Sequence, residues 1–185
     1  PEHRLASYGA TYLRDGDSSA ALECLEEART RDPRSAVIWE RLGLAHQLAG
    51  DHARAEEALK QAADLPKGSV ALLSLARFYL TTGRLADAGR ALVSALERHP
   101  QGEVQIRIEL AELERKLGRP AAALAILERL ASGRVPPHST LAVAVERDIA
   151  EILIAHARLS EAVAHLRLAL EHDPDDPETQ RRLAA

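Results

Sequence analysis

Eight histidines, a single cysteine and a short acidic run are the residues of this 185-residue chain whose types could support chemistry. No histidine pair has the H-E-x-x-H spacing of a zinc protease, and His165 and His172 lie two helical turns apart, which is too far for two ligands without a third group. Cys24 is alone, which excludes an internal disulfide and a cysteine-rich zinc site. We therefore expect no metal, no cofactor and no catalytic residue, and we do not expect an enzyme.

Two groups of carboxylates also have plain structural explanations. The acidic run at residues 173–178 lacks the glycine and the distal glutamate of a calcium-binding EF-hand loop. It is better explained as a turn and a helix start, with Asp176 as the N-cap and Pro177 as the first helical residue. Asp148 and Glu151 lie three residues apart in a long predicted helix, and we interpret them as a solvated pair on an exposed face.

The composition narrows the class of protein. A hydrophobic fraction of 46% excludes general disorder, and a net charge of −4 argues against nucleic acid as a partner. No apolar run approaches the roughly 18 residues of a transmembrane helix, so we expect no direct membrane insertion. The chain begins at Pro1, contains no methionine and shows no signal peptide. It is therefore expected to be a piece of a longer protein, and its compartment, cytoplasmic or periplasmic, is not predicted.

The elements that must position these residues are short helices, and residues 39–66 show their pattern most clearly. Apolar and small residues recur at helical spacing on both sides of Ala49-Gly50-Asp51. Gly50 can end the first helix in a left-handed turn, and Asp51 can cap the second. Neither helix is long enough to form a core alone, so the pair needs neighbours.

The same pattern recurs along the whole chain at intervals of about 34 residues. An alanine lies four residues before each member of a series of leucines: Leu25, Leu59, Leu92, Leu127 and Leu166. Such a repeat predicts an all-α solenoid of antiparallel helix pairs, here with about 11 helices. We predict a single array over residues 1–185, with 176–185 as a capping helix or the start of a sixth unit. The predicted units are residues 2–35, 36–68, 69–102, 103–138 and 139–175.

The repeat also matches a known pattern, W-x2-L-G-x2-Y followed by A-x3-F-x2-A-x4-P. Trp39, Leu42 and Gly43 match its first half, and His46 stands where tyrosine is favoured. With closing pairs such as Asp173-Pro174, the chain resembles the tetratricopeptide-repeat (TPR) family over nearly all its length, which implies a right-handed solenoid. It resembles the RNA-reading pentatricopeptide repeat less well, because it is acidic and its units end in Asp-Pro.

One interval is longer than the others and places an insertion at residues 132–138. Pro136 and Pro137 stop helix propagation there and force an extended link. The helix after the link is predicted over residues 139–156 and is longer than the other first helices. The insertion is either a tolerated loop or a point where the fifth unit sits at an altered angle.

The family resemblance implies that the first helices of the units line a concave groove for a peptide or an amphipathic helix of a partner protein. The predicted lining is mostly apolar in the first three units and more charged in the last two. Burying one valine or leucine is worth roughly 1.5–3 kcal/mol, so three or four could anchor a ligand. Alternatively, some of them pack between repeats. The predicted groove residues are Ala6, Ala10, Leu13, Val37, Glu40, Leu44, Gln47, Leu48, Val70, Leu73, Arg77, Leu80, Ile108, Glu112, Arg147 and Glu151.

We accordingly expect a non-catalytic scaffold or adaptor that binds a protein or peptide of unknown identity. Recognition of acidic chaperone tails is not expected, because the positions of the family's carboxylate clamp offer one cation, Arg41. Two alternatives stay open. The chain could be a self-assembling structural module that forms a homo-oligomer through its C-terminal helix. It could also be a regulatory or recruiting region of a larger bacterial enzyme, or part of a pilus or polysaccharide-export assembly factor.

Overall fold

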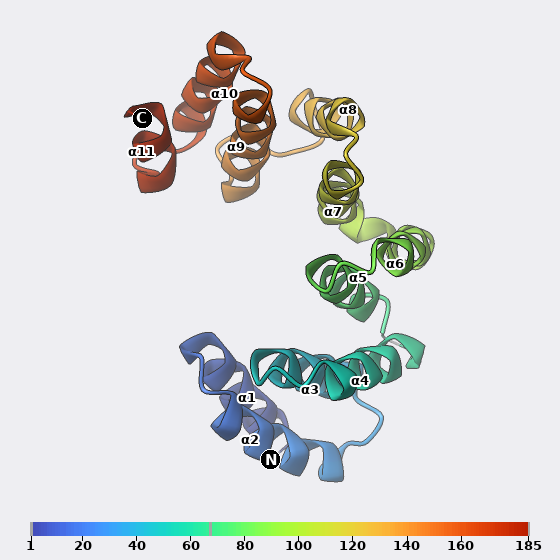
Figure 1. The fold of residues 1–185 in the computed structure, drawn as a ribbon. Coiled ribbons are helices and arrows are strands. Elements are labelled where there is room, and N and C mark those ends of the chain that lie inside the picture. The colour runs from blue at the N-terminus through green and yellow to red at the C-terminus, as the bar shows by residue number, and fades with distance from the viewer. Residues whose placement is uncertain (1, 67, 185) are drawn as a thin grey trace. The chain divides into compact units, whose positions relative to one another are not determined.

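The computed structural model describes residues 2–66 and 68–184, which form 11 α-helices and one 3-10 helix, Pro100–Gly102 (Figure 1). No strand occurs in these ranges, and none of the described helices is long and apolar enough to cross a bilayer. The predicted all-α class is confirmed. Consecutive helices form antiparallel pairs, and α11 (Pro177–Ala184) follows the last pair. The pairs are α1 (Glu2–Asp15) with α2 (Ser18–Arg31), α3 (Ala36–Leu48) with α4 (His52–Asp64), α5 (Ala71–Thr81) with α6 (Leu85–Arg98), α7 (Glu103–Lys116) with α8 (Pro120–Ala131), and α9 (Thr140–Ala155) with α10 (Leu159–His172).

The turn between α3 and α4 forms as its residues predict. Gly50 adopts a φ of +80°, a left-handed conformation that is strained for residues with a Cβ. Its amide donates to the carbonyl of Gln47 at 3.0 Å. Asp51 then caps α4, since its Oδ1 accepts a hydrogen bond from the Arg54 amide at 3.0 Å. The predicted hinge at Gly50 and Asp51 is confirmed.

The chain divides into two compact units, residues 1–102 (the N-terminal unit) and 103–185 (the C-terminal unit). In the N-terminal unit the second-helix leucines Leu25, Leu59 and Leu92 have no exposed surface. Leu59 packs directly onto Gly43, where a built Cβ would lie 2.5 Å from the leucine Cγ. The first helices also touch one another, α1 against α3 and α3 against α5. The Arg41 guanidinium of α3 donates to the Ala6 carbonyl of α1 at 2.8 Å.

In the C-terminal unit, α8, α9 and α10 share a core in which Leu127, Ile149 and Leu166 are buried. The 132–138 insertion belongs to this unit, because Val135 packs against the same core. Ser139 is the N-cap of α9, with its Oγ accepting from the Ala142 amide at 3.1 Å. The predicted helix over residues 139–156 corresponds to α9 and its two caps.

The C-terminal helix α11 begins as predicted. The Asp176 Oδ2 accepts a hydrogen bond from the Thr179 amide at 2.8 Å, and Pro177 is the first helical residue. Leu183 packs against the core of the C-terminal unit. Ala185 lies outside the described residues. The boundaries of the repeats, and the role of 176–185 as a cap, a sixth unit or an oligomer contact, stay predictions.

The contact between Gly43 and Leu59 gives a test of the packing. Gly43→Ala is expected to lower the free energy of unfolding by about 1–3 kcal/mol, because the added methyl group overpacks a closed interface. The measurement is urea unfolding followed by circular dichroism. In a Leu59→Ala background, which itself costs about 2–5 kcal/mol, the same substitution should cost less because the clashing side chain is gone. An equal cost in both backgrounds would contradict this account.

The turn between α9 and α10 contains an alanine, Ala157, in a backbone conformation that glycine adopts with less strain. Ala157 has a φ of +58°, in the region occupied by Gly16, Gly50, Gly83 and Gly118 at the ends of earlier first helices. Ala157→Gly is therefore expected to raise the free energy of unfolding by about 0.5–1 kcal/mol. The matched control Ala164→Gly, at an exposed position inside α10, should lower it by about 1 kcal/mol. Both values come from the same urea titrations, and a loss of stability at both positions would refute the explanation.

Candidate functional site

The predicted groove residues of the N-terminal unit lie along α1, α3 and α5, and hydrogen bonds fix the register of α3 against α5. Ser74 Oγ donates to Glu40 Oε1 at 2.5 Å, and Gln47 Nε2 donates to Thr81 Oγ1 at 3.4 Å. Both bonds join residues 34 apart in the chain, which is one repeat. They hold the side of α3 that carries Glu40 and Gln47 next to α5.

Beside these bonds lies a row of exposed aliphatic side chains, which we call the apolar stripe. It consists of Val37, Leu44 and Leu48 on α3 and of Val70 just before α5. These residues are 48%, 38%, 48% and 45% exposed. The three α3 residues recur with the period of the helix, so they share one side of it. The stripe is therefore an apolar surface that the described residues leave open.

Three other predicted groove residues lie in the interior of the N-terminal unit and do not line an open surface. Ala6, Leu73 and Leu80 are 6%, 8% and 4% exposed. Ala6 is covered because α1 packs closely on α2 and α3, and the α5 leucines are covered by neighbouring helices. These three residues therefore pack in the core. This agrees with the alternative, given in the sequence analysis, that some predicted groove residues pack between repeats. The predicted groove residues of the N-terminal unit that remain are exposed or half-buried: Ala10, Leu13, Glu40, Gln47 and Arg77.

In the C-terminal unit the four predicted groove residues separate into two places. Ile108, Glu112 and Glu151 line a cavity of about 260 Å³ between α7 and α9. Arg147 does not line this cavity. Its Nη1 lies 2.8 Å from Glu178 Oε2, so it links α9 to the start of α11.

We call the space between α7 and α9 the acidic cavity. Its apolar surface comes from Ile108, Ala111, Leu127 and Ile152, and Glu109 and Arg115 complete the lining. Together with Glu109 the lining contains four carboxylates, and the other three are Glu112, Asp148 and Glu151. Among the described residues α7 and α9 do not pack closely, in contrast to α1 with α3 and α3 with α5.

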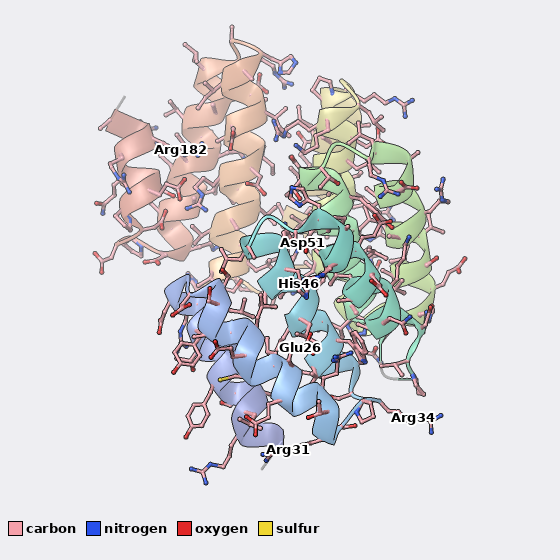
Figure 2. The ribbon with its side chains drawn as sticks, turned by 60° about the horizontal axis from the view of Figure 1, so that its bottom comes forward. Glu26, Arg31, Arg34, His46, Asp51 and Arg182 are labelled. Carbon is pink, nitrogen blue, oxygen red and sulfur yellow. The ribbon has the colours of Figure 1, made fainter. Side chains whose placement is uncertain are left out.

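Glu112, Glu151 and Asp148 differ in the partners that the described part of the chain gives them. Glu112 binds Arg115 of its own helix through two hydrogen bonds of 2.6 and 2.8 Å. Glu151 Oε2 lies 3.4 Å from the guanidinium of Arg182, which comes from α11 (Figure 2). Among the described residues, no side chain donates a hydrogen bond to the carboxylate of Asp148, so Asp148 is less compensated than Glu112 and Glu151.

The electrostatics of Asp148 reflect this position. Burial, followed by the negative charge of Glu151, raises the pKa of Asp148 to about 6, although the nearby Arg147 acts in the opposite direction. The interpretation of Asp148 and Glu151 as a simple solvated pair is therefore wrong for Asp148. A partly buried carboxyl group with a strongly raised pKa in a cavity is a recognised mark of a functional site.

Two histidines also have roles that the sequence did not indicate. The Nδ1 of His165 lies 2.7 Å from Oε2 of Glu146, a residue only 6% exposed. His46 lies near Asp51 at the α3–α4 turn, and burial lowers its pKa, so it is neutral at pH 7 (Figure 2). Both histidines pack as structural residues. No cluster of three His, Cys, Asp or Glu side chains suited to a metal ion occurs in the described ranges.

Comparison with known proteins agrees with this architecture. Four family models, each described as tetratricopeptide repeat, match residues 9–70, 46–105, 104–129 and 143–185. The chain belongs to the tetratricopeptide-repeat family. The TPR fold implies a scaffold for protein–protein interaction, and proteins of this family are generally non-catalytic.

Similar proteins are distant. The human PEX5-related protein is 27% identical over 123 residues, which cover 65% of this chain and 20% of that protein. The structure of Pseudomonas aeruginosa pilF has a TM-score of 0.77 at 20% identity and covers 99% of this chain and 82% of that one. The structure of the APC/C hetero-tetramer Cut9–Hcn1 has a TM-score of 0.76 at 18% identity, covering 99% and 36% of the two chains. The TPR chain thus spans one fifth of the human relative, and the structural likenesses concern the fold.

The raised pKa of Asp148 predicts a stability that depends on pH. The ordinary pKa of 3.8 applies in the unfolded chain, so the folded state binds the proton more tightly. Stability therefore falls as the pH rises from about 4 to about 6 and stays reduced above that range. Asp148→Asn removes this penalty and should raise the free energy of unfolding by about 1–3 kcal/mol at pH 7.5, but by little at pH 4.

The comparison uses urea unfolding at several pH values. Glu171→Gln, an exposed carboxylate on α10, is the matched control and should change stability little at any pH. A gain from Asp148→Asn that is the same at pH 4 and pH 7.5, or a loss at both, would overturn the electrostatic explanation.

Proposed function

We propose that this TPR chain is a non-catalytic scaffold that binds a segment of a partner protein along the apolar stripe. The supporting observation is the row of Val37, Leu44, Leu48 and Val70, each more than a third exposed. Covering one such side chain fully is worth roughly 1.5–3 kcal/mol. Because each is already half-covered and ordering a ligand opposes binding, we expect an affinity in about the micromolar range.

The surroundings of the stripe favour an amphipathic helix or an apolar peptide. Glu40 and Gln47 lie on the same side of α3 and are half-buried, and Arg77 on α5 is exposed. An apolar centre with polar side chains at its edge is the usual composition of a protein-binding surface. A helix that presents aliphatic residues on one face would cover such a stripe with few unpaired polar groups.

The relatives support this kind of role without naming the partner. The Cut9–Hcn1 structure, which has a similar fold, is of a hetero-tetramer, an assembly of more than one kind of chain. The similarity to pilF is one of fold at 20% identity, so a place in a pilus or export assembly factor stays an alternative. Self-assembly through α11 and a recruiting role within a larger enzyme are likewise alternatives.

The test places a photo-crosslinking amino acid at position 44, and separately at position 93, in the protein expressed in its native host. Val93 is an aliphatic residue of α6 that is 56% exposed, compared with 38% for Leu44, so it is a control of the same type with greater accessibility. A defined crosslinked protein is expected from position 44 and not from position 93. Its binding segment is then made as a peptide and titrated against the purified chain.

Substitutions in the apolar stripe test whether its side chains are responsible for the affinity for the peptide. Leu44→Glu and Leu48→Glu together should weaken the peptide by about a hundredfold, since they place two charges in an apolar contact. Val93→Glu should leave the affinity unchanged. Both substituted leucines are exposed, so circular dichroism and urea unfolding should report an intact fold. If the double variant binds as well as the unchanged chain, the stripe is not the binding surface.

A further inference from the structure

A second cavity of the C-terminal unit lies between the 132–138 insertion and the helices α8, α9 and α10, and we call it the link cavity. Its volume of about 320 Å³ is at the lower end of the range of about 300–1,000 Å³ that is typical of small-molecule sites. It shares no lining residue with the acidic cavity, and no predicted groove residue lines it. The apolar part of its lining consists of Ala131, Val135, Pro137, Ala142 and Val145.

The insertion forms a fixed wall of the link cavity. Val135 packs against the core of the C-terminal unit. The amide of His138 donates a hydrogen bond to Nδ1 of His172 at 3.3 Å, and the two imidazole rings meet edge to face with their centroids 5.7 Å apart. Because these contacts attach the insertion to α10 and to the core, the cavity is part of the folded unit and not a gap behind a loose loop.

The polar end of the link cavity is the carboxylate of Glu146, a residue of α9 that is only 6% exposed. Its Oε2 lies 2.7 Å from Nδ1 of His165 on α10. Its Oε1 makes no hydrogen bond among the described residues, although none of their side-chain oxygens is both fully buried and unpartnered. Oε1 therefore keeps some accessible surface. Since Glu146 lines the cavity, this oxygen is available to a ligand there.

The repeat pattern shows that a carboxylate at this place is a departure from the other unit. Glu146 corresponds to Trp39, because each lies the same number of residues before the buried leucine of its second helix. An apolar side chain here would avoid the cost of burying a carboxylate. The fifth repeat instead combines a buried carboxylate with an open cavity. The corresponding residues of the N-terminal unit are apolar: Leu5, Trp39 and Leu72.

The lining selects an organic cation with a short aliphatic stem. His165 is the ion-pair partner of Glu146 among the described residues, and the neighbouring Arg147 lies 2.8 Å from Glu178 instead. The donor set does not suit a metal ion, as judged over the described residues. An ammonium or guanidinium group has N–H donors for the free carboxylate oxygen, and an aliphatic stem would cover Val135 and Val145.

We propose that the link cavity binds a small organic cation, an ammonium or guanidinium group on a short aliphatic stem, whose N–H groups donate to Oε1 of Glu146. The cavity lies wholly in the C-terminal unit and uses no residue of the apolar stripe. It is therefore a separate site for a small molecule, and it does not depend on the proposed binding of a partner protein.

The probe is butylguanidinium, titrated at neutral pH into the full 185-residue chain and followed by backbone amide NMR. Shifts are expected at Ser132, Gly133, Val145 and Glu146. The dissociation constant should be about millimolar, which is ordinary for a ligand of this size. Butylurea, which has the same shape without the charge, should bind about tenfold more weakly or worse.

Variants of the protein locate the site. Glu146→Gln, which keeps the shape and removes the charge, should weaken butylguanidinium by about tenfold. Ala142→Leu places a larger apolar side chain in the cavity and should abolish binding with all charges retained, while urea unfolding reports an intact fold. This second variant keeps the test decisive if Glu146→Gln destabilises the chain. Glu128→Gln, at an exposed position of α8, is the matched control and should have no effect.

Several results would overturn the proposal. Equal binding of butylurea would mean that charge is not recognised, and equal loss with Glu128→Gln would indicate unspecific attraction. Unchanged binding to a folded Ala142→Leu variant would place the ligand elsewhere, and no shifts at several times the expected dissociation constant would leave the cavity without this ligand. Tighter binding of acetyl-arginine methylamide than of butylguanidinium would assign the cavity to a protein side chain instead of a free small molecule.

Discussion

The close approach of a leucine from one helix to a glycine or alanine of the helix before it is the contact on which this fold depends. Leu59 on Gly43 and Leu25 on Gly9 leave no room for a Cβ at either glycine. The leucines themselves have no exposed surface. Because helices of 8 to 16 residues cannot bury an apolar face alone, each pair is stable only when this contact is closed and neighbours cover its open side.

The same architecture produces two different surfaces, according to what the first helices present to one another. In the N-terminal unit, Ser74 donates to Glu40 and Arg41 donates to a backbone carbonyl, and α3 carries an outer row of aliphatic side chains. In the C-terminal unit, Glu112 on α7 and Asp148 on α9 carry the same charge, and a cavity lies between the helices. The two units thus differ in the side chains that their first helices present to one another.

Much of the fold could be predicted from the sequence, because its signals are local. Gly50 and Asp51 mark one turn and Asp176 marks the last helix start, since φ and capping preferences act within a few residues. The candidate site was harder to predict. Leu73 falls at a groove position by repeat spacing, yet a neighbouring helix covers it. Asp148 is beside Glu112 and Glu146 is beside His165 only after the chain has folded, so no local pattern could reveal either pair.

The Gly43–Leu59 contact also bears on how such a chain can change during evolution. The contact requires small residues on the inward side of each helix pair. It does not restrict which residue types occupy the outward positions. Mutations at those outward positions therefore leave the frame intact, while a change at the contact needs a second change across it. Duplicated repeats can consequently keep one architecture and acquire separate chemistries, as the aliphatic side chains of α3 and the carboxylates of α9 illustrate.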